Sequence, residues 1–176
     1  ANSLWIQAGY LSQNTNGSGM NTQLELNETD FRQIKNLAGI DDASPVYFQI
    51  LPVKTAFHQL DNVNVFGVNR HFFKIKPYPL LIGGRYFHQP DQTEKRAIIG
   101  KDLALTLFNQ ANPLGKTLLI AGHAFVIIGV VDANASNSDE ASFSIWLPES
   151  CFKILFSPHP IQGILLKIPS HSDRGL

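Results

Sequence analysis

Residues 112–131 read NPLGKTLLIAGHAFVIIGVV, and this stretch decides the fold of the chain. Its first residues, Asn112 to Gly115, predict a turn. Two β-prone runs follow, Thr117–Ile120 and Ala124–Val131, and the Ala121-Gly122-His123 link between them predicts a β-hairpin. Because the second run is apolar at almost every position, we expect it to lie in the core and to be buried on both faces.

The segments around this hairpin alternate between strand and helix patterns. Before it, Arg96–Ile99 predicts a short strand and Lys101–Asn109 predicts a helix with one apolar face. That face consists of Leu103, Ala104, Leu107 and Phe108. Further strands are expected at Ser3–Gln7, Val46–Leu51, Val53–Gln59, Val63–Val68, Phe143–Leu147 and Ile161–Ile168, with a short helix from Pro148. Polar runs at Ser12–Gln23 and Asp132–Ser142 predict loops, and the tail Pro169–Leu176 is expected to be frayed.

A first helix is predicted by its end signals. Asn27 is a good N-cap, and Asp30 stands at the capping-box position three residues later. Gly39 supplies a left-handed stop, so the helix is expected to span about Glu28 to Ala38. Its buried stripe is expected to consist of Phe31, Ile34 and Leu37.

Composition excludes several classes of protein. The 14 Lys and Arg residues balance the 14 Asp and Glu residues, so no net field attracts nucleic acid. Cys151 is the one cysteine, which rules out an intrachain disulfide. The longest apolar run, Ala124–Val131, is interrupted by Gly129 and is far shorter than the roughly 20 residues that span a bilayer. With 176 residues, the chain can bury a core without disulfides or metals.

Two ligand-binding motifs fail at specific positions. Gly115-Lys116-Thr117 resembles the end of a phosphate-binding loop, but Gln110 stands where that loop needs its first glycine. A calcium loop with alternating oxygen ligands would need a bidentate Glu at its twelfth position, where this chain has Phe143. Its ligands would have been Asp132, Asn134 and Ser136. We therefore interpret both segments as turns and connectors.

The candidates for catalysis or metal binding are also weak. His88, Asp91 and Glu94 could form a metal site, but their spacing needs a helix and Pro90 interrupts the run. Cys151 lies on an amphipathic segment and is more typical of a small core residue than of a nucleophile. We therefore expect no catalytic, cofactor-binding or metal-binding residue, and the sequence assigns no partner-binding residue.

A basic and aromatic cluster could indicate stacking on single-stranded nucleic acid. It consists of Arg70, His71, Phe72, Phe73, Lys74 and Lys76. Because the net charge of the chain is zero, we expect instead that the two phenylalanines pack into the core beneath a locally basic turn.

Eight short motifs follow one another in order between residues 24 and 148. They are Leu26–Asp30 leading to Gly39-Ile40, Phe66–Val68 with Phe72-Phe73, Gly84–Phe87, Ala97–Gly100, Leu107-Phe108, Asn112–Lys116, Gly122–Val130 and Ile145–Pro148. Together they resemble the periplasmic core domain of MacB-like ABC-transporter permeases (the MacB/FtsX/LolE type). The matched glycines are interpreted as structural: Gly100 as a strand-to-helix turn, Gly115 as a turn and Gly122 as the hairpin bend.

The resemblance implies an α+β fold with two subdomains. A porter-like βαβ unit would comprise residues 1–57 and 148–176, and a β-rich, Sabre-like unit with one helix would comprise residues 58–147. In the family a second long helix follows the last strand, so the porter-like unit is expected to be incomplete at its C-terminal end.

The resemblance also implies a function without chemistry. The domain would be extracytoplasmic and would couple ATP-driven movement of membrane helices to export or to engagement of an adaptor. Its partners would be its own membrane helices, a second permease copy, a fused or separate cytoplasmic ATPase, and a periplasmic adaptor or carrier protein. The loops Ser12–Gln23 and Ala133–Ser142 are candidate partner-facing segments.

Three alternatives stay open at this point. The domain could belong to a lipoprotein-release permease that hands cargo to a carrier. An exposed apolar hook or concavity would favour this alternative. It could be a small-ligand binding module with an internal pocket. It could be an enzyme, if replacement of His88 or Cys151 abolished a measurable turnover.

Overall fold

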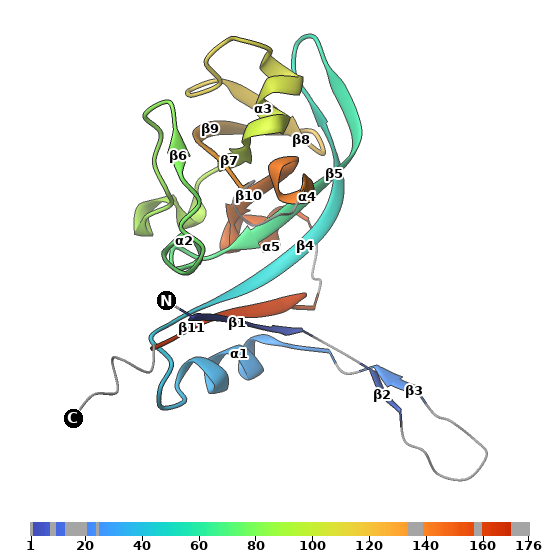
Figure 1. Ribbon diagram of the computed structural model, residues 1–176. Helices are drawn as coiled ribbons and strands as arrows, with labels where there is room; N and C mark the ends of the chain where they lie inside the picture. The colour runs from blue at the N-terminus through green and yellow to red at the C-terminus, as the bar shows by residue number, and fades with distance from the viewer. Residues whose placement is uncertain are drawn as a thin grey trace.

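The computed structural model describes residues 2–7, 10–12, 21–23, 25–133, 139–156 and 160–169. It confirms the α+β fold class, and Figure 1 shows the arrangement of the elements. The strands are β1 (Asn2–Gln7), β2 (Tyr10–Ser12), β3 (Asn21–Gln23), β4 (Asp42–Lys54), β5 (Gln59–Val68), β6 (Leu80–Leu81), β7 (Arg96–Gly100), β8 (Thr117–Ile120), β9 (His123–Val131), β10 (Ser144–Pro148) and β11 (Gly163–Ile168). The helices are α1 (Glu28–Lys35), α2 (Phe72–Ile75), the 3₁₀ helix η1 (Gln89–Thr93), α3 (Lys101–Phe108), α4 (Asp139–Ser142) and α5 (Glu149–Leu155).

Six strands close into a ring. β4, β5, β10, β7, β9 and β8 pair in this order, and β8 pairs with β4 again to complete it. The β10–β5 and β7–β9 pairs are parallel, and the other pairs in the ring are antiparallel. We call this ring, with α2–α5 and η1, the barrel. The predicted hairpin is confirmed as β8 and β9, with Ala121 and Gly122 both at positive φ in its turn.

A smaller layer lies beside the barrel. β11 pairs with β1 on one side and with the first residues of β4 on the other, and α1 lies next to these strands (Figure 1). We call β1, β11, residues 42–46 and α1 the basal layer. β4 therefore belongs to both parts: Asp42 to Val46 pair with β11, whereas Val46 to Lys54 pair with β5.

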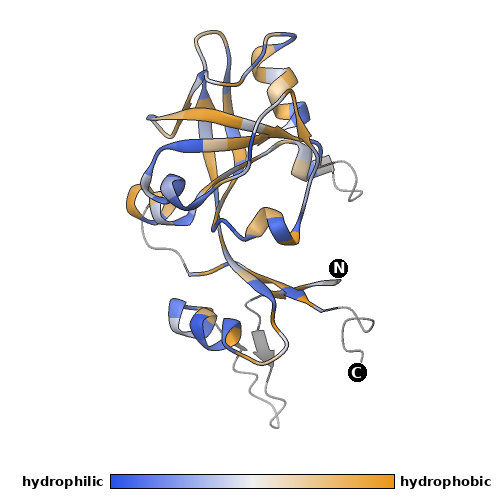
Figure 2. Cartoon of the chain, turned by 90° about the vertical axis from the view of Figure 1, so that its left-hand side faces the viewer, coloured by the Kyte–Doolittle hydropathy of each residue, from blue (hydrophilic) through white to orange (hydrophobic). Residues whose placement is uncertain are grey.

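Two hydrophobic clusters form the core. The larger one fills the ring with alternate residues of its strands, such as Val65, Ile120 and Phe125, and continues to the buried faces of α3 and α5. The second lies around Phe73 and Trp146. Figure 2 shows hydrophobic residues concentrated on the barrel strands, whereas α1 is largely hydrophilic. The buried face predicted for α3 is confirmed at Leu103, Ala104 and Leu107, whereas Phe108 is only partly buried.

The prediction of separate strands before and after Pro52 was wrong. β4 continues through this position, and its register against β5 shifts between Leu51 and Val53. A proline has no N–H to donate, but at this irregularity it needs none, and its carbonyl accepts a hydrogen bond from the Ala121 N–H.

The first helix is shorter than expected. The capping box of Asn27 and Asp30 is confirmed, and Gly39 has the predicted positive φ of 87°. The helix ends at Lys35, however, so the prediction that Leu37 belongs to its buried stripe was wrong, and this side chain is 59% exposed. A helix this short presents only two turns to the core.

Several polar or apolar segments also differ from expectation. The ends of the loop predicted at Ser12–Gln23 pair as strands β2 and β3, and residues 13–20 lie outside the described part. The end of the Asp132–Ser142 loop forms α4, and residues 134–138 and the tail from 170 on also lie outside it. β9 is buried on both faces only over Gly129–Val131, because Val130 packs in the larger hydrophobic cluster and Val131 packs in the second one.

Candidate functional site

The basal layer and the barrel are joined by β4, by two polar bridges, and by buried residues of β11 that belong to the same hydrophobic clusters as the barrel. α1 is the loosest part of this joint because none of its residues is buried. Phe31 and Ile34 pack half-buried against the larger hydrophobic cluster. A helix held by so little apolar contact can shift at a small cost in free energy.

The first bridge connects the start of α1 to α5. Lys153 Nζ donates to Glu28 Oε1 at 2.5 Å, and the Tyr47 hydroxyl donates to the same oxygen at 3.4 Å. Lys153 Nζ also lies 5.5 Å from the centroid of the Tyr47 ring. The hydrogen bond and charge of Lys153 lower the pKa of Glu28. Burial, with the nearby Glu149 and Glu28 carboxylates, raises the pKa of Tyr47, so its hydroxyl stays a donor.

The second bridge connects the start of β4 to the N-terminal end of α2. His71 Nδ1 lies 2.9 Å from Asp42 Oδ1, close enough for an ion pair when the imidazole is protonated, but without the geometry of a hydrogen bond. Burial lowers the pKa of His71, while the Asp42 charge acts in the opposite direction. The neighbouring Asn69 fixes the segment, because its side chain donates to the Ala43 carbonyl and accepts from the His71 N–H.

Two hollows flank the α1–α5 bridge. One, of about 400 Å³, is lined by α1, the start of β4, the segment before α2, Gln92 and Glu149. Burial raises the pKa of Glu149. The other, of about 440 Å³, lies on the far side, where Glu28, Tyr47 and Lys153 form part of its wall. At α1 the joint is therefore made of a few polar contacts beside open space, whereas at β11 it is closely packed through the buried residues Ile164, Leu165 and Leu166.

The structure places the candidate catalytic and metal residues in structural roles. Cys151 is buried on α5, and burial raises the pKa of its thiol, which disfavours the thiolate that a nucleophile needs. Asp91 is buried and accepts two hydrogen bonds from Arg85, at 2.7 and 2.9 Å. The prediction that Pro90 prevents a helix was wrong, because it lies at the start of η1, where its missing N–H is not needed.

The remaining sequence candidates are dispersed. His88 Nδ1 lies 3.5 Å from Asp91 Oδ2, whereas Glu94 pairs with Arg96. Gly115 has a positive φ of 81° in a turn before β8. Over the residue ranges described, no group of three or more His, Cys, Asp or Glu side chains is placed to hold a metal ion. Of the proposed calcium ligands, Asn134 and Ser136 lie outside these ranges.

The basic and aromatic cluster is arranged as predicted. Phe72 and Phe73 are buried, with ring centroids 5.0 Å apart, and Phe73 also packs edge-on to Trp146.

Within the described part of the chain, no helix is long and apolar enough to cross a membrane.

Sequence reasoning missed both bridges. Glu28 and Lys153 lie 125 positions apart, and although Glu28 falls within the motif Leu26–Asp30, Lys153 is marked by no motif. The capping box identified the start of α1 and so placed Glu28 on it, but nothing in the sequence connected that position to α5. His71 was likewise named only as a member of the basic and aromatic cluster, and Asp42 was not singled out by any pattern.

The chain resembles known proteins over nearly its whole length. The model of the family described as the MacB-like periplasmic core domain matches residues 1–175. Two proteins named "Macrolide export ATP-binding/permease protein MacB" are similar to it. The one from Pasteurella multocida is 27% identical over 149 residues, and the one from Haemophilus ducreyi is 29% identical over 160 residues. They match 83% and 86% of this chain, which spans about a quarter of their length, 23% in each case.

Solved structures share the fold. The periplasmic region of MacB from Actinobacillus actinomycetemcomitans superimposes with a TM-score of 0.78 at 21% identity, covering 97% of this chain and 76% of that one. The extracellular domain of the ABC-type transporter YknZ from Gram-positive bacteria gives 0.74 at 19% identity, covering 97% and 86%.

Proposed function

The chain belongs to the family of MacB-like periplasmic core domains, and from this premise we propose that it transmits force between the membrane helices of an ABC permease and a partner outside the membrane. The family places the domain on the extracytoplasmic side of the membrane. ATP would be hydrolysed by another part of the parent transporter, and the domain itself would carry out no catalysis.

The joint between the basal layer and the barrel carries this proposal. A coupling domain needs a stiff part that moves as a unit and a defined place where it moves. The closed ring supplies the stiff part. The Glu28–Lys153 bridge and the half-buried packing of α1, beside hollows of about 400 and 440 Å³, supply contacts that can break and reform while β4 and β11 stay packed against the barrel.

We also propose the subdomain division expected from the sequence. Residues 1–57 with 148–176 would form the porter-like unit, and residues 58–147 would form the Sabre-like unit. The grouping of β1, β11 and α1 in one layer supports the first, and the membership of β7, β8 and β9 in the ring supports the second. The later part of β4 and α5, which this division gives to the porter-like unit, lie in the barrel and would form the boundary between the two units.

The partners follow from the same premise. They would be the membrane helices of the parent permease, its second copy, and an adaptor or carrier protein. Because the relatives are named for macrolide export, a macrolide is the first cargo to test. The alternatives are docking of a lipoprotein carrier and binding of a small ligand. Under either alternative, fixing α1 to α5 should leave transport or binding unchanged.

Cross-linking across the joint tests the coupling role. In the full transporter, with Cys151→Ala to remove the native thiol, Glu28→Cys and Lys153→Cys would be joined by a short bismaleimide. We expect cross-linked protein to lose ATP-driven transport while it still binds ATP, because α1 can no longer move against α5. The measurement is transport before and after cross-linking.

A matched pair separates fixation of the joint from modification itself. Lys101→Cys and Leu105→Cys are exposed, lie one turn apart on α3 and do not span the joint. Cross-linking this pair should leave transport unchanged. Full transport with the α1–α5 pair cross-linked would overturn the proposed function.

A further inference from the structure

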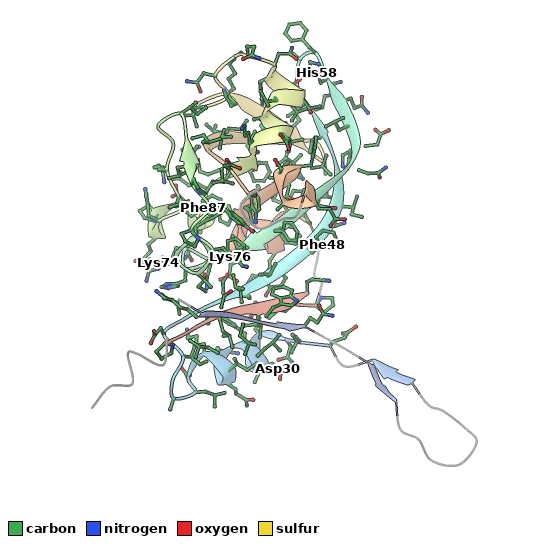
Figure 3. The ribbon with its side chains drawn as sticks, viewed as in Figure 1. Asp30, Phe48, His58, Lys74, Lys76 and Phe87 are labelled. Atoms are coloured by element: carbon green, nitrogen blue, oxygen red, sulfur yellow. The ribbon has the colours of Figure 1, made fainter. Side chains whose placement is uncertain are left out.

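A rigid turn displays an aromatic side chain at the far end of the barrel. The β4–β5 turn is fixed by the Thr55 N–H, which donates to the His58 carbonyl at 2.8 Å, and by Thr55 Oγ1, which accepts from the Phe57 and His58 N–H groups. Between these contacts Phe57 is 91% exposed. Figure 3 shows His58 at the end of the molecule opposite Asp30 of α1. The turn therefore holds Phe57 in solvent in a fixed position.

A groove of about 430 Å³ adjoins this side chain. Its walls are residues 55–58 on one side and the end of α3 with the start of β8 on the other. Phe108 and Ala111 provide its accessible apolar surface, with the buried Leu107 beneath, and Phe57 stands at its edge. An exposed aromatic side chain next to an apolar groove is typical of a site where a partner inserts a side chain.

The charge of the groove is one-sided. Lys116 lies in its wall, with Nζ 5.8 Å from the centroid of the Phe108 ring, and none of the described residues that line it is acidic. Lys54, the last residue of β4, directly precedes the turn. In addition, His58 Nδ1 is buried without a hydrogen-bond partner among the described residues. The groove thus has uncompensated positive charge and an unpaired polar atom beside its apolar surface.

We propose that this groove docks a segment of a partner protein that presents an apolar side chain next to carboxylates. The apolar side chain would lie against Phe108, Ala111 and Phe57, and the carboxylates would lie near Lys116. Electrostatic complementarity of this kind selects partners and speeds their encounter. That the partner is the adaptor or carrier of a transporter rests on the proposed function; the docking chemistry itself does not.

Two peptides of opposite charge test the docking chemistry on the 176-residue chain. The probes are Ac-EELFEE-NH₂ and Ac-KKLFKK-NH₂, titrated into ¹⁵N-labelled protein by NMR. We expect the acidic peptide to shift the amide signals of residues 55–59 and 107–117 saturably, and the basic peptide to bind at least about tenfold more weakly, because like charges repel across the groove. Raising the salt concentration should weaken binding of the acidic peptide.

Variants separate the groove from general surface charge. Lys116→Glu should weaken the acidic peptide at least about tenfold and favour the basic one, and Phe57→Ser should weaken binding of both. Lys101→Glu makes the same charge change outside the groove and should leave binding unchanged. Equal loss with Lys101→Glu, shifts at other surfaces, or shifts explained by association of two copies of the chain would overturn the proposal. None of these outcomes depends on movement at the joint. A failure of the docking proposal can therefore be told apart from a failure of the proposed coupling function.

Discussion

At the scale of single residues, the glycines of the family motifs do different work. Gly115 and Gly122 have positive φ values of 81° and 85°, as turns require. Gly100, by contrast, has ordinary extended backbone with φ −71°. A Cβ at this position would lie 2.3 Å from the Ser142 carbonyl oxygen. Gly100 lies at the predicted passage from strand to helix, between β7 and α3, but a glycine is needed there for the close approach of the α4 end and not for its backbone conformation.

Gly100→Ala should destabilise the protein by about 2 kcal/mol, because the clash is with backbone that cannot rotate away. Urea denaturation measures the change in the free energy of unfolding. Gly39→Asn is the control: its position has positive φ but no atom within 4 Å of a Cβ, and Asn tolerates that conformation. A loss at Gly39 as large as the loss at Gly100 would contradict the steric explanation.

The ionisation of Glu149 makes the stability of the folded protein depend on pH, and the direction of this dependence follows from its pKa shift. Burial raises its pKa in the folded protein, so the folded state holds this proton more tightly than the unfolded state does. The stability that the protonated form provides is present below the unfolded pKa and is lost as the pH rises through the folded pKa. The Lys153 charge opposes the shift, and Glu28 reinforces it.

Glu149→Gln should therefore stabilise the protein more at pH 7 than at pH 4, since the glutamine has no charge to bury. Thermal unfolding at both pH values measures the difference between variant and wild type. The exposed Glu140→Gln should show little such change. A Glu149→Gln effect that is the same at pH 4 and pH 7 would show that burial of the charge is not its cause.

At the scale of elements, α1 has strong sequence signals but few tertiary contacts, whereas β4 has weak sequence signals but many tertiary contacts. α1 has a complete capping box, yet none of its residues is buried. β4 contains Pro45 and Pro52, yet it pairs on both sides and its residues Val46, Tyr47, Leu51 and Val53 are buried. Local end signals thus make α1, whereas tertiary pairing makes β4.

Asn27→Ala should open α1 without weakening the barrel. Loss of an N-cap costs about 1 kcal/mol, which corresponds to roughly fivefold faster amide hydrogen exchange if α1 opens locally. Native-state exchange should show this acceleration in α1 and none in β9, whose amides are protected by the ring. Equal acceleration in β9 would mean that α1 opens only when the whole molecule unfolds.

At the scale of the whole molecule, the joint and the docking groove lie at opposite ends of one stiff body. β4 runs from the basal layer, where it pairs with β11, to the turn that displays Phe57 (Figure 1). A displacement at α1 would therefore be carried along a strand that is bonded into the ring. This arrangement makes the cross-linking test and the peptide test independent, because each concerns one end of the molecule.

The sequence by itself determined the elements that depend on neighbours along the chain. The β8–β9 hairpin, the capped start of α1, the buried face of α3 and the turn at Gly115 all follow from contacts within a few residues. The order of Gly, Pro and apolar motifs also indicated the family, because these residues mark where the backbone turns.

Only the tertiary structure decided what lies between distant segments. Several features depend on contacts between residues that are far apart in the chain. They are the closure of the ring by β8, the continuation of β4 through Pro52, and the bridges from Glu28 to Lys153 and from Asp42 to His71. Charged and polar side chains are tolerated at any exposed position. The sequence therefore contains no periodic pattern that indicates which two of them form a contact. The proposed coupling and docking sites therefore became visible only when the folded chain brought their residues together.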